Sequence, residues 1–287
     1  MDFVAPRIAF LGATTCARPR AVIIGAPLDR TESFRSGTRE APERIRAVSD
    51  VLEMYSPLLG ADLEDVALAD LGDVPIAADD VECALDKVAQ AIASVAPEAV
   101  PILLGGEHTA TVGAVRGALR VFPDLAVVQV DAHADLRDAY AGERLSHATV
   151  MRRIADALGM DRIVQLGIRS GTREEFALAR QCRHSTADLA IPAGLRRWLA
   201  DRPLYLSVDI DVLDPSCAPG TGCPEPGGAT FAELLSMIHS LRGLRVIGVD
   251  VMEVLPAADV NDVTSIAAAK LVRECAIAFA GPPRGEH

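Results

Sequence analysis

Short, almost continuous apolar runs recur along this chain, and each leads into a polar or glycine-rich stretch. The runs are rich in Val, Ile and Leu, and they lack the apolar–polar alternation of a strand with one wet face. This pattern is typical of parallel strands buried on both sides, because helices then cover both faces of the sheet. The runs occupy residues 21–27, 100–108, 125–133, 162–170, 203–211 and 244–253.

Helical patterns separate several of these runs. In residues 81–97 apolar side chains recur at three- and four-residue steps, which places them on one stripe of a helix. Residues 41–53 carry Pro42 near their start, where the missing backbone donor is harmless. Residues 264–281 read as a nearly buried helix. Strands that alternate with helices predict βαβ units, so we expect a single α/β domain over residues 1–287 with a mostly parallel sheet.

Composition excludes several classes of function. A formal charge of −12 argues against nucleic acid as a partner, because phosphate binding needs a concentrated positive face. The apolar runs are shorter than the roughly 20 residues of a membrane-spanning helix. The N-terminus lacks the features of a signal peptide, so a cytoplasmic location is the simplest expectation. Six cysteines without CxxC pairs favour free thiols over a disulfide framework.

Polar side chains stand at the downstream ends of four apolar runs. In an open α/β sheet the ligand crevice lies beyond the carboxyl ends of the strands, which gives these residues a common meeting place. On an extended chain, positions two apart point the same way, which allows Asp131, His133 and Asp135 to converge. The same spacing relates Asp209 and Asp211. The strand-end residues are His108, Asp131, His133, Asp135, Asp209, Asp211 and Glu253.

Four aspartates in one place would repel one another, and burial would raise their pKa values further. Two divalent cations supply the four positive charges that balance them, while His108 and His133 add neutral nitrogen donors. Mixed carboxylate and imidazole ligands without thiolate favour Mn²⁺ or a similar ion. Six ligands are too many for a closed tetrahedral zinc site. Each motif alone also suits an acidic or glycine-rich turn, but together at strand ends they favour a two-metal hydrolytic centre.

Four motifs follow one another along the chain: GGEHT from residue 105, DAHADLRD from 131, SVDIDVLDP from 207 and EVLP from 253. In this order and spacing they resemble the ureohydrolases, the family of arginases and agmatinases. Residues 25–46 are similar to the family's N-terminal segment, and residues 218–228 to its long substrate-side loop. The likeness extends from about residue 20 to about residue 280.

The resemblance implies a three-layer α/β/α sandwich of the arginase kind with two Mn²⁺ per chain. It implies that Asp131 and Asp209 bridge the metals. The remaining ligands are His108 and Asp135 for one metal, and His133 and Asp211 for the other. In this family, water activated by the two ions attacks a guanidinium carbon, which releases urea and an amine. The physical logic agrees, since two metals lower the pKa of a shared water.

Two further residues match catalytic positions of the family. His147 resembles the histidine that relays protons to the leaving amine, and a histidine titrates in the useful range. Glu253 resembles the glutamate that holds the guanidinium, which a carboxylate can bind through two parallel hydrogen bonds. Taken alone, His147 could equally be a helix cap or a surface residue, and Glu253 a salt-bridge partner.

The stretch after DAHAD bears on the substrate. Arginases have an asparagine directly after this motif, whereas the present chain has Leu136 and Arg137, which is an agmatinase-like version. We therefore expect hydrolysis of agmatine to putrescine and urea, a step of polyamine biosynthesis. If Arg137 faces the pocket, it would repel the ammonium of agmatine and suit a carboxylate-tailed substrate such as 4-guanidinobutyrate or guanidinopropionate. If it faces solvent or a subunit interface, the objection disappears.

Two other classes of function compete with the enzyme. A retired, metal-binding homologue would lose His147, Glu253 or a ligand first, yet all eight positions are filled. A metal-dependent deacetylase on a related fold would hold a single zinc and would not need both Asp209 and Asp211.

The resemblance also implies a homo-oligomer, a trimer or a hexamer. Cys217 and Cys223, with five residues between them in the substrate-side loop, match no usual metal pair and are expected to be packing residues.

Overall fold

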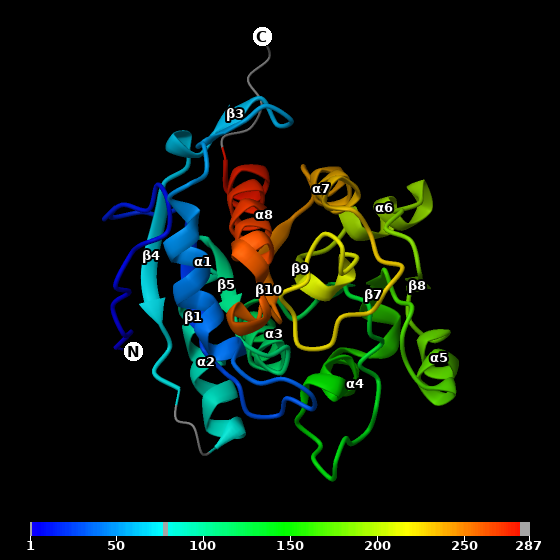
Figure 1. The fold of residues 1–287 in the computed structure, drawn as a ribbon. Helices are drawn as coiled ribbons and strands as arrows, with labels where there is room; N and C mark the ends of the chain where they lie inside the picture. Colours follow the sequence, from blue (N-terminus) through cyan, green and yellow to red (C-terminus); the bar gives the residue numbers. More distant parts are fainter. Residues whose placement is uncertain (1, 77–79, 282–287) are drawn as a thin grey trace.

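The computed structural model describes residues 2–76 and 80–281, and the ends of the predicted domain, residues 1 and 282–287, lie outside them. Eight strands form one sheet in the order β4-β1-β5-β10-β9-β6-β7-β8, and every neighbouring pair is parallel. Figure 1 shows β4 at one edge and β8 toward the other. The strands are β1 (Ala21–Ala26), β4 (Leu68–Asp73), β5 (Val100–Gly105), β6 (Ala126–Val130), β7 (Ile163–Leu166), β8 (His184–Thr186), β9 (Leu204–Asp209) and β10 (Val246–Met252). A separate hairpin joins β2 (Tyr55–Ser56) to β3 (Ala61–Asp62).

Helices cover both faces of the sheet and enclose two apolar cores. One core is formed with α1, α6, α7 and α8, and the other with α2, α3, α4 and α5. The helices are α1 (Ala41–Ser49), α2 (Val81–Val95), α3 (Ala110–Val121), α4 (Val150–Leu158), α5 (Arg173–Ala179), α6 (Ala193–Ala200), α7 (Phe231–Ser240) and α8 (Val263–Ala280). This arrangement confirms the three-layer α/β/α sandwich with a parallel central sheet.

The central strands are apolar on both sides because each side faces a core. Within β1, Ile23 belongs to the core under α1 and α8, while its neighbours Val22 and Ile24 belong to the core under α2 and α3. Both faces of β5, β6, β9 and β10 are divided between the cores in the same way. The continuous apolar runs in the sequence therefore follow from burial on two sides.

The sequence patterns missed both edge strands. In β4 the run is interrupted by Asp70, whose two carboxylate oxygens accept hydrogen bonds of 2.9 and 3.0 Å from the buried Arg46 of α1. The other edge strand, β8, has only three half-buried residues. An edge strand has one neighbour and less burial, so its sequence carries less of the apolar signal.

The close contact between α2 and α3 depends on two glycines in α3. A Cβ atom on Gly113 would lie 2.6 Å from the backbone oxygen of Leu85, and one on Gly117 would lie 2.4 Å from that of Ala89. Leu85 and Ala89 both belong to α2, so the backbones of the two helices touch where the glycines face them. Glycine in a helix costs about 1 kcal/mol relative to alanine, and here the close approach compensates for that cost.

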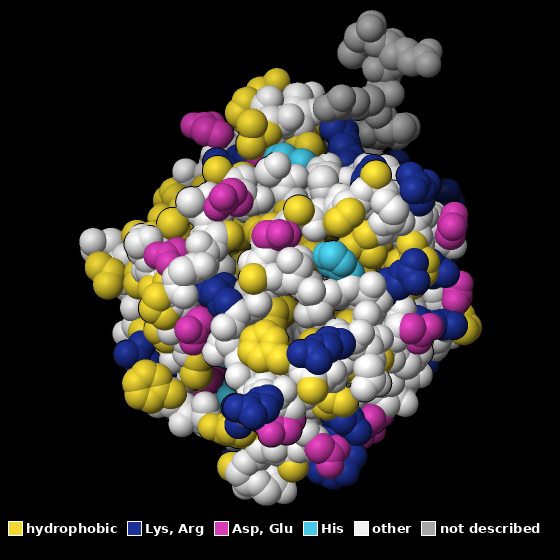
Figure 2. All heavy atoms as spheres, turned by 90° about the vertical axis from the view of Figure 1, so that its right-hand side faces the viewer, with side chains coloured by type: hydrophobic (Ala, Val, Ile, Leu, Met, Phe, Trp, Pro, Cys, Tyr) yellow, Lys and Arg dark blue, Asp and Glu magenta, His cyan; other side chains and the backbone are white. Residues whose placement is uncertain are grey.

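No helix among residues 2–76 and 80–281 is long and apolar enough to cross a membrane. Figure 2 shows the side of the molecule that carries α5, α6 and β8. On this face basic, acidic and apolar side chains are interspersed.

Candidate metal centre and active site

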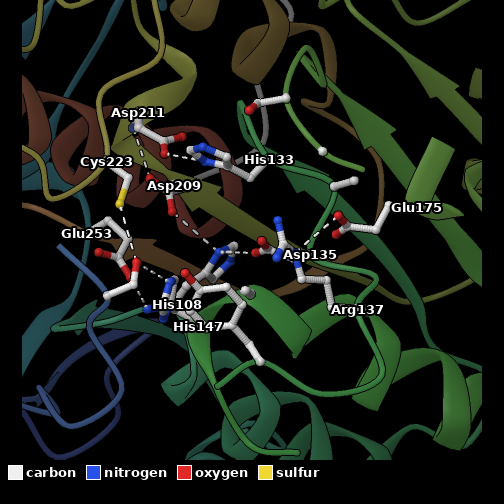
Figure 3. Close-up of a pocket in the computed structure, with 16 residues that line it drawn as sticks. His108, His133, Asp135, Arg137, His147, Glu175, Asp209, Asp211, Cys223 and Glu253 are labelled. Atoms are coloured by element: carbon white, nitrogen blue, oxygen red, sulfur yellow. Dashed lines mark hydrogen bonds and ion pairs between the residues drawn. The ribbon is translucent and has the colours of Figure 1, made fainter. Parts of the chain in front are cut away.

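The strand-end residues converge at the carboxyl ends of β5, β10, β9 and β6, which are consecutive neighbours in the sheet. They surround a pocket of about 260 Å³, and Figure 3 shows their carboxylates and imidazoles turned toward one another. Asp131 is fully buried and contacts both His108 and His133. The predicted site residues that line the pocket are His108, His133, Asp135, His147, Asp209, Asp211 and Glu253.

The convergence was predicted, but the extended-chain reason for it was only partly right. β6 ends at Val130, and Asp135 has a left-handed backbone with φ of 53°. Asp211 lies in a short 3₁₀ helix, Ile210–Val212, rather than on an extended strand. The carboxylate of Asp209 caps this turn by accepting a 2.9 Å hydrogen bond from the backbone N–H of Asp211. Turns, rather than strict alternation, bring the second aspartate of each motif into the pocket.

His108 is the centre of one group of donor atoms. Its Nδ1 lies 3.2 Å from an oxygen of Asp131, 3.1 Å from one of Asp135 and 3.4 Å from one of Asp209. The Nδ1 atom is buried and has no hydrogen-bond partner. The other ring nitrogen, Nε2, is 2.9 Å from the hydroxyl of Ser207. With Nε2 donating to Ser207, Nδ1 is left as a free lone pair among three carboxylates, which is the usual arrangement of a metal-binding histidine.

A second group of donor atoms shares Asp131 with the first. The Nδ1 atom of His133 lies 2.8 Å from a carboxylate oxygen of Asp211 and 3.8 Å from one of Asp131. The two groups, His108 with Asp131 and Asp209, and Asp131 with His133 and Asp211, each bring their ligand atoms within 4.8 Å of one another. An unpartnered imidazole nitrogen among carboxylates fits a metal site, and a shared aspartate fits two adjacent ions.

The pKa values of the pocket report how much negative charge is crowded there. Burial, together with the charge of Asp131, raises the pKa of Asp135 to about 7. Burial and the neighbouring aspartates raise the pKa of Asp209 well above its usual range. Burial acts against protonation of His133, but the charge of Asp211 outweighs it and raises the pKa to about 11. Protons and divalent cations therefore compete for the same buried donors.

His147 begins the 3₁₀ helix His147–Thr149 and lines the pocket. Its Nε2 is 3.2 Å from the hydroxyl of Ser33, and its ring meets that of Tyr140 edge-on with centroids 5.6 Å apart. Burial lowers the pKa of His147, so the imidazole is neutral at neutral pH and able to accept a proton. Its position in the pocket distinguishes it from a surface cap.

Glu253 directly follows β10 and has a left-handed backbone with φ of 64°. Its Oε1 accepts a 2.6 Å hydrogen bond from the backbone N–H of His108. Burial and the charges of Glu32 and Asp209 raise the pKa of Glu253 well above its usual range. A cationic ligand beside Glu253 would offset this crowding of negative charge.

Arg137 lines the pocket, and two other side chains of the same protein hold its guanidinium. Its Nε is 3.3 Å from the Oε2 atom of Glu175, and its guanidinium lies over the ring of Tyr140, 5.0 Å from the centroid. Glu175 is itself buried. Its carboxylate also caps the N-terminus of α5 and accepts a hydrogen bond from the backbone N–H of Leu136. Figure 3 shows this pair on the opposite side of the cluster from Cys223.

The two loop cysteines differ. Cys217 packs against the core, as predicted. Cys223 lines the pocket, with its Sγ 3.9 Å from the hydroxyl of Ser33, and neither of the two groups that share Asp131 includes it. Sequence reasoning also missed Ser33 and Tyr140 as pocket residues. Only the similarity of residues 25–46 to the family's N-terminal segment pointed toward Ser33.

Comparison with known proteins agrees with this site. The model of the arginase family matches residues 19–278. An agmatinase of Bacillus cereus is 41% identical over 261 residues, which are 89% of this chain and 90% of that protein. A guanidinobutyrase of Pseudomonas aeruginosa is 36% identical over 280 residues, 92% of this chain and 88% of that protein. The crystal structure of agmatine ureohydrolase of Thermoplasma volcanium superposes with a TM-score of 0.85 at 36% identity and covers 96% of this chain and 95% of that one.

The match extends over most of the chain, and the sheet, the two helical layers and the strand-end pocket are all within it. This chain belongs to the arginase family. The predicted ureohydrolase resemblance is thereby confirmed, together with the expected class of enzyme, a hydrolase of guanidino C–N bonds.

Proposed function

We propose that this protein hydrolyses agmatine to putrescine and urea at a centre of two Mn²⁺ ions. The observation that carries the proposal is the pair of His/Asp groups that share Asp131 at the base of a pocket also lined by Glu253 and His147. The curated agmatinase relative supports agmatine as the substrate. We propose polyamine biosynthesis as the role of the reaction, because its product putrescine would be a polyamine.

The metals would be held by the two observed groups of donors. Asp131, which belongs to both groups, and Asp209 would hold the two ions. The other ligands would be His108 and Asp135 for one ion, and His133 and Asp211 for the other. Manganese suits this hard and borderline donor set, which contains no thiolate. When bound, two divalent ions supply a water nucleophile of lowered pKa near neutral pH.

The protein's own residues would orient the substrate and move its protons. Glu253 would bind the guanidinium through its carboxylate, whose Oε1 is held in place by the hydrogen bond from the backbone N–H of His108. His147, neutral and next to Ser33, would first accept a proton released in the reaction and would then pass it to the nitrogen of the leaving amine. Such a transfer lets the leaving nitrogen depart as an uncharged amino group, and it avoids the amide anion, which is a poor leaving group.

A carboxylate-tailed guanidino acid is the second candidate, and Arg137 is the observation that favours it. Arg137 lines the pocket, while its partner Glu175 is buried and also accepts hydrogen bonds from the backbone N–H groups of Leu136 and Thr172. The outer pocket therefore offers a substrate tail a guanidinium more readily than a carboxylate. The guanidinobutyrase relative agrees with this alternative. The ion pair with Glu175 partly offsets the charge of Arg137, which keeps agmatine as the first candidate.

The proposal extends to the setting of the enzyme. We propose one domain, a trimeric or hexameric homo-oligomer and a cytoplasmic location, with no nucleic acid or membrane as partner. The family resemblance supports the oligomer, and the net charge of −12 supports the absence of a nucleic-acid partner.

A substrate panel with urea detection tests the proposal. Protein loaded with Mn²⁺ should release urea from agmatine faster than from 4-guanidinobutyrate, 3-guanidinopropionate, arginine or guanidine. Faster release from guanidinobutyrate would establish the second candidate. Metal loading without urea from any compound would leave a retired, metal-binding homologue and refute the enzyme.

A further inference from the structure

Two buried glutamines stand side by side behind the loop that carries Asp131 and His133. Gln129 belongs to β6 and Gln165 to β7, and they are partners in the register of these parallel strands. Neither side chain is accessible to solvent. A primary amide without a partner in such a place costs several kcal/mol on transfer from water, so the hydrogen bonds of these two residues explain their presence.

The hydrogen bonds run in one direction, toward Asp131. The Nε2 group of Gln129 donates to Oδ2 of Asp131 at 2.7 Å and to the backbone oxygen of His133 at 3.0 Å. The Nε2 group of Gln165 donates to Oε1 of Gln129 at 2.7 Å and to the backbone oxygen of Ala134 at 2.9 Å.

The orientation of both amides follows from their partners. A carboxylate and two backbone carbonyls accept hydrogen bonds and donate none, so the NH₂ groups have to face them. At the outer end, the hydroxyl of Ser185 donates to Oε1 of Gln165 at 3.2 Å. Every polar atom of the two amides thus has a partner, and rotating either amide by 180° would place oxygen against oxygen.

We propose that Gln129 and Gln165 are positioning residues for the metal centre, a role that rests on the proposed function of the neighbouring carboxylates. Asp131 is held from two sides, because its Oδ1 accepts a 2.6 Å hydrogen bond from the backbone N–H of His133 while Gln129 holds Oδ2. Each carboxylate oxygen has a second lone pair, so both remain able to bind an ion.

The same pair of glutamines fixes the chain between the ligands. It binds the carbonyl groups of His133 and Ala134, just before Asp135 adopts its left-handed backbone. Preorganisation of this kind raises metal affinity, because hydrogen-bonded partners behind a ligand keep it in the binding rotamer. Loss of such a partner typically weakens metal binding by about 10- to 100-fold.

Titration of the metal-free full-length protein with MnCl₂ by isothermal calorimetry tests the inference. Gln129→Leu, which keeps the size of the side chain and removes both donors, should weaken Mn²⁺ binding about 10- to 100-fold. Gln129→Glu has nearly the same shape but turns an acceptor toward Asp131, so it should bind at least as weakly. Ser185→Ala, at the outer end of the chain of hydrogen bonds, is the matched control and should stay within about twofold of the wild type.

Thermal unfolding of the metal-free variants accompanies the titrations. If Gln129→Leu does not fold, the double variant Gln129→Leu/Gln165→Leu is titrated instead, since removal of both partners of a buried hydrogen bond is better tolerated. Wild-type Mn²⁺ affinity in Gln129→Leu or in the double variant would overturn the inference. So would wild-type affinity in Gln129→Glu, because that result would reduce Gln129 to a packing role. Failure of the wild type itself to bind Mn²⁺ would instead refute the proposed function.

Discussion

At the scale of single residues, the two histidines of the pocket have separable tasks. His133 points its Nδ1 at two aspartates, whereas His147 contacts the hydroxyl of Ser33 and the ring of Tyr140. His133→Ala should therefore lose bound metal and activity together. His147→Ala should keep its metal and lose about 10²- to 10⁴-fold in kcat, the range for a general acid. Metal content by atomic spectrometry and urea release measure the two effects.

His184→Ala, in the edge strand β8 and outside the pocket, serves as the control for both variants. A single tightly bound ion per chain in active wild-type protein would contradict the dinuclear centre. Loss of metal in His147→Ala would contradict the division of tasks.

Arg137 should govern the preference for the tail of the substrate. Its guanidinium lines the pocket, and removal of a positive charge there favours an ammonium over a carboxylate. Arg137→Leu should raise the ratio of kcat/KM for agmatine to that for 4-guanidinobutyrate by about tenfold, which corresponds to about 1.4 kcal/mol. Steady-state kinetics on both substrates give the ratio. Arg144→Leu, an exposed arginine outside the pocket wall, should leave it unchanged. An unchanged ratio in Arg137→Leu would mean that the tail lies elsewhere.

Glu32 should make the folded protein less stable as the pH rises. Burial and the charges of Glu107 and Asp29 raise its pKa from 4.5 to about 7. The folded state therefore binds more protons than the unfolded chain between these values, so stability falls as the pH rises through this window. Glu32→Gln removes the loss and should stabilise the protein at pH 8 by about 1–3 kcal/mol, with a smaller gain at pH 5.

Urea denaturation of the wild type and Glu32→Gln at both pH values measures this difference. Glu43→Gln, an exposed carboxylate, is the control and should change stability little at either pH. A gain that is equal at pH 5 and pH 8 would rule out titration as its cause.

At the scale of elements, the strands that build the site were predictable and the edges of the sheet were not. The runs at β1, β5, β6, β7, β9 and β10 are apolar because two helical layers bury them. β4 carries Asp70 toward a buried arginine on another element, and nothing local in the sequence announces this partner. The partner of Asp70 is distant in the sequence, so the residues next to Asp70 do not reveal that this segment is a buried edge strand.

The candidate site divides in the same way. The positions of His108, Asp131, Asp209 and Glu253 follow from where strands end, so the sequence predicts their convergence. The sequence patterns did not predict the left-handed backbone of Asp135, nor the 3₁₀ turn after Asp209, which the carboxylate of Asp209 caps. The direction of Arg137 was also open, since Glu175 lies 38 positions further along the chain.

The close packing of α2 on α3 predicts that a larger side chain at Gly117 destabilises the protein. Gly117→Ala adds a Cβ atom 2.4 Å from the backbone oxygen of Ala89, so the two helices have to separate. Although alanine gains about 1 kcal/mol of helix propensity, the overpacking should destabilise the protein by about 1–3 kcal/mol in net. Gly194→Ala in α6 is the matched control, because its Cβ would have no neighbour closer than 4.0 Å. It should be neutral or stabilising. Chemical denaturation compares the two variants, and a stabilised Gly117→Ala would contradict the contact.

At the scale of the whole molecule, the pocket joins the middle of the sheet to loops from distant parts of the chain. Four neighbouring strands each end in a predicted ligand or a predicted substrate-binding residue, and residues 33, 147 and 223 line the pocket from three further segments. The same carboxylates that attract cations repel one another when no cation is present. Metal-free protein should therefore store unfavourable electrostatic energy at the centre of its own sheet.

Metal should consequently stabilise the entire fold. A ligand that binds only the folded state at 100 times its Kd adds about 2.7 kcal/mol per site, and two Mn²⁺ sites add about twice that. For a chain of this size, 1 kcal/mol shifts Tm by roughly 2–4 °C, so saturating Mn²⁺ should raise Tm by roughly 10–20 °C over protein treated with a chelator. Differential scanning calorimetry measures the shift. Asp209→Asn/Asp211→Asn, which removes charge from the site, should raise the Tm of the metal-free protein and abolish the response to Mn²⁺. A metal response that survives in this double variant would place the stabilising ions outside the pocket.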